Sequence, residues 1–298
     1  MRIAITTPSG HVGSAVTHFV LEAGAGVRLL ARRPEKLRDF ANRGAKVVRG
    51  SQDDSEYVTW MTHDVDALLW VTPPGYGSDD LRAYQNRLGM VAAEAIRANQ
   101  IPRVVNLSSI GANLYSGVGP IGGLHDVEGL LTDACENIVH LRPGFFFENF
   151  LWHIEEIRDH GLIRMPLSGS TRYPMLATRD IARVAADCLL DEKWKGREIR
   201  ELHGPEDLSL HEAAAAISVG LQRKVEFQKI DREEARREML DVGMSENAAD
   251  LMLEMYEAVE TGRLRPTQLR SPQTTTPTTL TEFAREVLTP MIAEYAHP

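Results

Sequence analysis

The N-terminal segment joins a short strand to a helix through a turn that contains two glycines. Ile3-Ala4-Ile5 is the apolar run of a buried strand, and residues 14–22 have helical spacing. The turn between them reads Thr7-Pro8-Ser9-Gly10-His11-Val12-Gly13. A turn of this kind also begins ordinary helices. Its place directly after a first strand favours a dinucleotide-binding unit, whose glycines let backbone N–H groups reach a pyrophosphate at the positive end of the helix.

Strand-like and helical stretches alternate through the first half of the chain. Strands are predicted at residues 3–5, 27–31, 45–49, 65–71, 103–107 and 137–141. Helices are predicted between them at 14–22, 34–43, 56–63, 81–99 and 127–134. Strands that alternate with helices are joined by crossovers, so we expect an α/β fold with a doubly wound parallel sheet of the Rossmann type.

Ligands of such a sheet bind at the carboxyl ends of its strands, so the residues that follow each strand are the candidate cofactor contacts. These candidates are Thr7, Ser9, Gly10, His11, Val12, Gly13, Arg32, Arg33, Lys36, Gly50, Ser51, Gln52, Thr72, Pro73, Pro74, Leu107, Ser108, Pro143, Gly144, Phe145 and Phe146. They come from six separate loops, which the fold brings to one edge of the sheet.

The end of the second strand distinguishes between the two nicotinamide cofactors. Sites for NAD place an Asp or Glu about 20 residues after the glycine turn, where the carboxylate binds the ribose 2′-OH. Here that region carries Arg32 and Arg33, followed by Lys36. A guanidinium suits a 2′-phosphate, so we predict NADP(H) over NAD(H). The alternative is that these side chains only solvate a loop.

The composition restricts the partners of the protein. A net charge of -9 and a pI of about 5.6 argue against nucleic acid, which requires clustered basic residues. No apolar run approaches a membrane span, and a strand at the N-terminus leaves no place for a signal peptide. Cys135 and Cys188 are the only cysteines, and no Cys/His spacing indicates a metal. We therefore expect a cytoplasmic protein, with a homodimer left open.

Four stretches of the chain resemble the NmrA-like group of atypical short-chain dehydrogenase/reductases. The glycine turn is similar to Gly-Ala-Thr-Gly-x-x-Gly in relatives, with Thr7 in place of the first glycine. The other stretches are residues 106–112, residues 127–131 with 141–149, and residues 178–182 with 185–186. The resemblance covers about residues 2–284 and implies NADP(H) binding.

The resemblance also implies a smaller, mostly helical C-terminal substrate lobe. We expect residues 1–149, with 176–205 returning to them, to form the NADP(H)-binding domain, and residues 150–298 to form mainly the substrate lobe. Capping boxes at Ser209 and Thr279 predict two helix starts in this part of the chain. Residues 231–262 read as two amphipathic helices separated near Gly243, either a lid, a fixed helical pair or a subunit contact.

The catalytic pair of ordinary short-chain reductases is missing. These enzymes use a Tyr with a Lys four positions later, and none of the seven tyrosines of this chain has that lysine. Some NmrA-like relatives keep the lysine alone, and the matching position here is Leu124. The candidates that remain are Ser108 and Ser109, as hydrogen-bond donors to a carbonyl oxygen, and His125, as a proton donor. His125 also fits a polar surface residue at a helix start.

Two functions from different classes follow. The first is an NADPH-dependent ketoreductase or quinone reductase, which transfers hydride directly to a flat, aromatic small molecule without the Tyr-Lys pair. Apolar and aromatic residues after the sixth strand suit such a substrate, and the candidate contacts are Phe147, Asn149, Trp152, Tyr173 and Met175. Each of these also suits a hydrophobic core. The second function is a non-catalytic NADP(H)-binding redox sensor that acts through a protein partner.

Overall fold

A parallel sheet lies at the centre of the computed structural model, which describes residues 1–295. Its seven strands are β1 (Arg2–Thr6), β2 (Gly26–Ala31), β3 (Lys46–Arg49), β4 (Ala67–Val71), β5 (Val104–Leu107), β6 (Ile138–Pro143) and β10 (Arg197–Leu202). Their order in the sheet is β10-β6-β5-β4-β1-β2-β3, and every neighbouring pair is parallel. The predicted Rossmann-type fold is confirmed, with the strand order reversing between β1 and β4.

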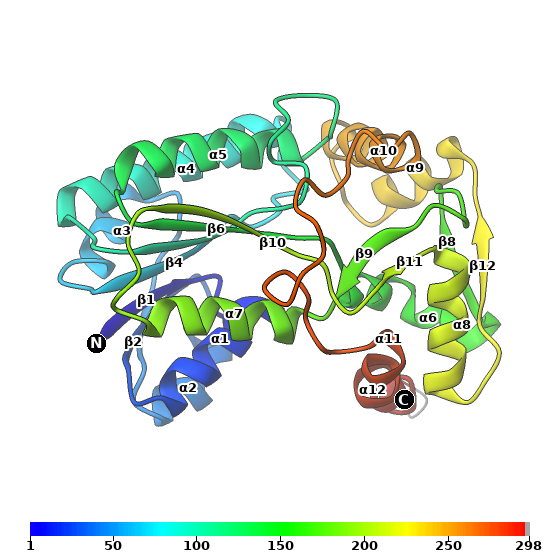
Figure 1. Cartoon of the computed structure of the whole chain (residues 1–298), viewed down its shortest axis with the longest axis horizontal. Helices are drawn as coiled ribbons and strands as arrows, with labels where there is room; N and C mark the ends of the chain where they lie inside the picture. The colour runs from blue at the N-terminus through cyan, green and yellow to red at the C-terminus, as the bar shows by residue number, and fades with distance from the viewer. Residues whose placement is uncertain (296–298) are drawn as a thin grey trace.

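Helices cover both faces of the sheet (Figure 1). One face packs against α1 (His11–Glu22), α2 (Arg38–Asn42) and α7 (Thr178–Leu190), and the other against α3 (Ser55–Met61), α4 (Leu81–Asn99) and α5 (Ile121–Ala134). The pleat of β1 explains this arrangement, because Ile3 and Ile5 point to the first face and Ala4 to the second.

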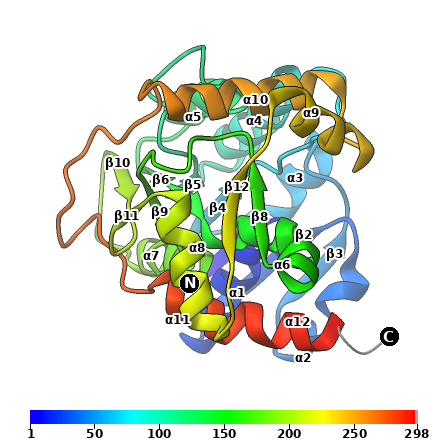
Figure 2. The same ribbon diagram turned by 90° about the vertical axis from the view of Figure 1, so that its right-hand side faces the viewer.

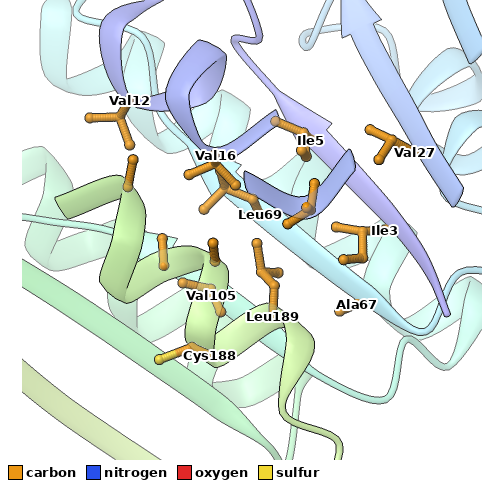
Figure 3. Close-up of a cluster of buried hydrophobic side chains, with 14 of the residues drawn as sticks. Ile3, Ile5, Val12, Val16, Val27, Ala67, Leu69, Val105, Cys188 and Leu189 are labelled. Atoms are coloured by element: carbon orange, nitrogen blue, oxygen red, sulfur yellow. The ribbon is translucent and has the colours of Figure 1, made fainter. Parts of the chain in front are cut away.

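The core beneath α1 and α7 fixes the position of the glycine turn. Figure 3 shows Ile3 and Ile5 of β1 beside Val16 of α1 and Leu189 of α7, and all four side chains are fully buried. Burying a side chain of this size stabilises the fold by about 1.5–3 kcal/mol. The strand before the turn and the helix after it are therefore anchored in the same apolar cluster.

The remaining elements form a second body, seen on the right of Figure 1 and facing the viewer in Figure 2. It has two small sheets, one of β7 (Phe145–Phe146), β9 (Tyr173–Leu176) and β11 (Asp207–Leu208), and one of β8 (Leu162–Met165) and β12 (Glu226–Lys229). Its helices are η2 (Phe147–His153), α6 (Ile154–His160), α8 (Leu210–Leu221), α9 (Arg232–Asp241), α10 (Glu246–Glu260), α11 (Leu280–Phe283), the π-helical η3 (Ala284–Leu288) and α12 (Thr289–Tyr295).

Several local predictions agree with these elements and others need correction. Ser209 and Thr279 form the predicted capping boxes, and α9 and α10 are separated around Gly243 as expected. The helix predicted at 34–43 is instead a 3₁₀ turn η1 (Pro34–Leu37) followed by α2, because Leu37 leaves helical geometry with φ -117° and ψ 20°. In the C-terminal lobe, residues 224–227 read as a strand from the sequence and overlap β12, whereas β7, β8, β9 and β11 were not predicted.

A long connection from α10 to α11 lies against the edge of the main sheet. Glu201 of β10 accepts hydrogen bonds from the backbone N–H groups of Thr267 and Gln268, and Asp180 of α7 accepts two from Thr278. Burial opposes ionisation of Glu201, but these bonds and one from His203 outweigh it and hold its pKa below the usual range. The connection thus joins the C-terminal helices to the parallel sheet, as the orange and red segment of Figure 1 shows.

Candidate functional site

The turn after β1 presents unpaired backbone donors at the start of α1. Gly10 N–H donates to the Thr7 carbonyl at 3.0 Å, and Ser14 N–H makes the first helical bond, to Gly10 O at 2.8 Å. The N–H groups of His11, Val12 and Gly13 before it have no backbone acceptor within residues 1–295. Ser9, Gly10 and His11 are exposed, so an anion can reach this end of the helix.

Gly13 allows the close packing of this turn. A Cβ on Gly13 would lie 2.3 Å from the Thr7 carbonyl oxygen. Thr7 itself has φ 47°, a conformation that is costly for a β-branched residue and that glycine adopts without strain. A hollow of about 300 Å³ adjoins the turn and the start of α7, lined by Ser9, Gly10, His11, Ser14, Ala15, His18, Thr178 and Arg179.

Side chains tie the strand ends together beside the point where the strand order reverses. The Thr6 hydroxyl accepts from Val71 N–H at 2.8 Å and lies 3.2 Å from the Leu69 carbonyl, which links β1 to β4. Gln52 donates to the Val71 carbonyl at 3.1 Å and links the loop after β3 to β4. Gly50 packs directly against the ring of Tyr57, whose hydroxyl donates to Val48 O at 2.7 Å. The loops after β1, β3 and β4 therefore meet at one edge.

The basic residues after β2 are free to bind a ligand. Arg32, Arg33 and Lys36 are exposed, and none of them forms an ion pair with a carboxylate in the part of the chain that the structure describes. Their neighbour Glu35 pairs instead with Arg49, at 3.1 Å. Two guanidinium groups and an ammonium group thus lie at the same carboxyl edge as the turn.

The other predicted cofactor contacts occupy the loops after β4, β5 and β6. Thr72, Pro73, Leu107, Gly144, Phe145 and Phe146 are half-buried, Pro74 is exposed, and Ser108 and Pro143 are buried. Ser51, in the loop after β3, is also half-buried. The Pro143 carbonyl already accepts from Ile110 N–H at 3.0 Å, so this residue holds the β5 loop against β6. Gly144 lets β9 approach, since a Cβ there would lie 2.2 Å from the Pro174 oxygen.

The three candidate catalytic side chains differ in accessibility. The Ser108 hydroxyl is enclosed and has no hydrogen-bond partner among the described residues. The Ser109 hydroxyl is half-buried and donates to the Ile110 carbonyl at 3.1 Å. The Nδ1 of His125 lies 2.8 Å from the Ala112 carbonyl, and Ala112 N–H donates to Ser109 O at 3.1 Å. Ser109 and the α5 residue His125 are thus joined through Ala112, and the Nε2 of His125 has no hydrogen-bond partner within residues 1–295.

Two of the predicted substrate contacts are corrected by the structure. Phe147 has no exposed surface and packs on Phe283 with ring centroids 5.6 Å apart, and Met175 is 3% exposed. Both belong to the core of the C-terminal lobe, because η2 and β9 turn these side chains inward, away from any ligand. Asn149 and Tyr173 are half-buried and Trp152 is 64% exposed, so these three have surface to offer.

Sequence reasoning missed residues that position the site. Glu128 of α5 and Arg142 of β6 form a buried bidentate pair at 2.8 and 2.6 Å, which fixes α5 beside the carboxyl end of β6. Glu148 accepts from the N–H and hydroxyl of Thr178 and so caps α7. Burial raises the pKa of Glu148 despite these bonds. The sequence did offer a signal for two of these residues, because Arg142 and Glu148 are charged residues inside the mainly apolar stretch 141–149.

Neither a membrane segment nor a metal site is found in the described part of the chain. No helix within residues 1–295 combines the length and apolar character needed to cross a bilayer. The same residues contain no group of three or more His, Cys, Asp or Glu side chains that could hold a metal ion.

Comparisons with known proteins show to which proteins this chain is similar. The sequence model of the NmrA-like family matches residues 1–284. The NAD(P)H azoreductase of Xenophilus azovorans is 28% identical over 254 residues, covering 85% of this chain and 86% of that protein.

Two solved structures have the same fold at 20% identity. The NADPH-dependent quinone oxidoreductase of Escherichia coli, solved with NADPH, aligns with a TM-score of 0.75 over 99% of this chain and 100% of that one. The triphenylmethane reductase of Citrobacter sp., solved with NADP(H), aligns with a TM-score of 0.78 over 96% and 99%.

Proposed function

The chain belongs to the NmrA-like family, and from this premise we propose that it is an NADPH-dependent oxidoreductase that reduces a flat, conjugated small molecule. One observation carries the proposal: open backbone donors on α1 and the unpaired Arg32 and Arg33 share one edge of the sheet. This combination matches the pyrophosphate and the 2′-phosphate of a single NADP(H) molecule.

The residues of this edge fit the cofactor. The N–H groups of His11, Val12 and Gly13 bind the pyrophosphate, and the Cβ-free position 13 allows the required close turn. Arg32 and Arg33 hold the 2′-phosphate, with Lys36 adding charge. When bound, NADPH supplies a hydride. The protein orients the reactants and excludes water, with residues 1–149 and 176–205 as the cofactor domain and 150–298 mainly as the substrate lobe.

Proton handling falls to the turn after β5. Ser109 is the accessible serine, and it donates a hydrogen bond to the substrate once it releases the Ile110 carbonyl. His125 donates the proton from Nε2 when the ring is cationic, because Nδ1–H is held by the Ala112 carbonyl. The hydroxyl of Ser108 has no hydrogen-bond partner among the described residues. Because this hydroxyl is enclosed, it reaches a ligand only if the loop after β5 shifts.

The substrate class rests on the relatives. The relatives are named as an azoreductase, a quinone oxidoreductase and a triphenylmethane reductase, and azo compounds, quinones and triphenylmethane dyes are all conjugated. These substrates accept hydride and delocalise the resulting electron pair, which lowers the demand for a strong acid and suits a chain without the Tyr-Lys pair. We therefore place a quinone ahead of a simple ketone.

The test measures cofactor choice and turnover together. The wild-type protein is expected to bind NADPH at least about tenfold more tightly than NADH, and Arg32→Ala and Arg33→Ala each to weaken NADPH about tenfold while NADH binding stays constant. Arg38→Ala, an exposed arginine on α2, is the matched control. Equal affinities for the two cofactors in the wild type contradict the proposal. Tight NADPH binding without reduction of any quinone, azo or triphenylmethane dye identifies a redox sensor instead.

A further inference from the structure

Tyr76 and Trp152 form an aromatic contact between the two bodies of the protein. Tyr76 lies in the loop after β4, five residues beyond the end of that strand, and Trp152 lies on η2. Their ring centroids are 6.4 Å apart at 73°, an edge-to-face arrangement. Trp152 nevertheless keeps 64% of its surface exposed, so most of the indole face is open to a ligand.

The backbone around Tyr76 is held by the connection between α9 and α10. Ser245 N–H donates to the Tyr76 carbonyl at 2.9 Å, and the Ser245 hydroxyl donates to Ser78 O at 2.6 Å. Leu81 N–H donates to the Asn247 side chain at 2.9 Å. The loop is thus fixed from the C-terminal side, and the phenol of Tyr76 has a defined position between η2 and α10.

The Tyr76 side chain contacts residues of the second body. Its ring meets Trp152, and its electrostatic neighbour is Tyr256 of α10, which packs against the core of the C-terminal lobe. Burial raises the pKa of both phenols, which therefore stay protonated at neutral pH. Neither hydroxyl has a hydrogen-bond partner within residues 1–295, and both residues keep accessible surface. Two phenol donors without a hydrogen-bond partner among the described residues thus lie close to the exposed Trp152.

We propose that Tyr76 and Trp152 bind the planar ring of the substrate, and that they select neutral, fused-ring quinones and dyes over small carbonyl compounds. The open indole face stacks on the ring, and the Tyr76 ring covers its edge. The hydroxyl of Tyr256 offers a hydrogen bond to an oxygen or nitrogen of the substrate, whereas Tyr76 contributes through its ring. This inference rests on the proposed function and adds the residues that decide substrate class.

Equilibrium binding of menadione, a flat naphthoquinone, to the NADP⁺-loaded protein tests the pair. Tyr76→Leu and Trp152→Leu are each expected to weaken menadione about tenfold, while NADPH affinity stays within about twofold. Tyr76→Phe keeps the ring and is expected to match the wild type within about twofold. Trp60→Leu removes a tryptophan of similar exposure (54%) from α3 and is the control.

The outcomes separate this inference from the proposed function. Unchanged menadione affinity in both leucine variants would show that Tyr76 and Trp152 do not bind the substrate ring. An equal loss of NADPH affinity would also overturn the inference, because it would place the two rings over the cofactor. A loss in Tyr76→Phe as large as in Tyr76→Leu overturns the stacking role. Since Trp152 is mostly exposed, its variant carries the test if Tyr76→Leu fails to fold. Menadione binding through the pair without reduction contradicts the proposed function alone.

Discussion

The Thr7 carbonyl oxygen lies 2.3 Å from the point where a side chain on Gly13 would begin. The turn and the first turn of α1 are packed so closely that position 13 accepts no Cβ, and the contact is with backbone that has no freedom to move aside. This contact makes the glycine at position 13 a requirement of both the fold and the proposed cofactor site.

Gly13→Ala is therefore expected to lower the free energy of unfolding by about 1–3 kcal/mol and to abolish measurable NADPH binding. Urea denaturation and equilibrium titration with NADPH measure the two effects. Gly129→Ala is the control, because Gly129 lies on α5 with no atom within 4 Å of an added Cβ. That variant is expected to be unchanged or up to about 1 kcal/mol more stable. A Gly13→Ala protein that binds NADPH like the wild type would show that the turn does not hold the pyrophosphate.

His153 makes the stability of the C-terminal lobe depend on pH. Burial, assisted by the Arg164 guanidinium, lowers the pKa of His153 to about 4. In the unfolded chain the imidazole of His153 is protonated below about pH 6.5, whereas in the folded protein it is protonated only below about pH 4. Acidification between these two pH values therefore favours the unfolded state. The wild type is expected to lose stability through this window, and His153→Gln to lose less.

Urea denaturation at several pH values, compared between the two proteins, checks this dependence. His63→Gln serves as the matched control, since His63 is an exposed histidine between α3 and β4. Parallel curves for the wild type and His153→Gln would rule out a buried neutral imidazole at position 153.

Ser245 connects the α9–α10 pair to the loop after β4, and this connection tests whether residues 231–262 form a lid. Its hydroxyl accepts from Ala248 N–H at 3.1 Å, which caps α10, and donates to Ser78 O. Ser245→Ala is expected to cost about 0.5–2 kcal/mol and to speed hydrogen exchange in α9 and α10. Thr279→Ala, which removes a comparable cap from α11, is the control and is expected to leave hydrogen exchange in α9 and α10 unchanged.

In the wild type, a lid predicts slower exchange in α9 and α10 once NADP⁺ and a quinone are bound. Exchange that ignores both ligands would identify a fixed helical pair. Mass spectrometry of the exchanged peptides distinguishes the two outcomes.

Local periodicity was sufficient to predict the parallel sheet and its helices. The central strands β1, β4 and β5 are mainly apolar runs that are largely buried, and such runs are visible one segment at a time. The edge strand β10 was not visible as a strand, because its sequence is charged and three of its first residues are exposed. The same reasoning finds β12 two residues early, since residues 224–227 read as a strand, and it misses β7, β8, β9 and β11, which are two to four residues long.

The sequence by itself determined the Rossmann-type fold, the turn after β1 and the basic residues after β2, because short-range patterns encode strands, turns and charge. Only the tertiary structure decided that Phe147 and Met175 belong to the core and that Trp152 stays exposed, since burial depends on which distant segments pack together. It also decided that the ring of Tyr76 contacts Trp152, which is 76 positions away in the sequence. Ser245 in turn binds the backbone of the loop that carries Tyr76. No local pattern carries contacts of that separation.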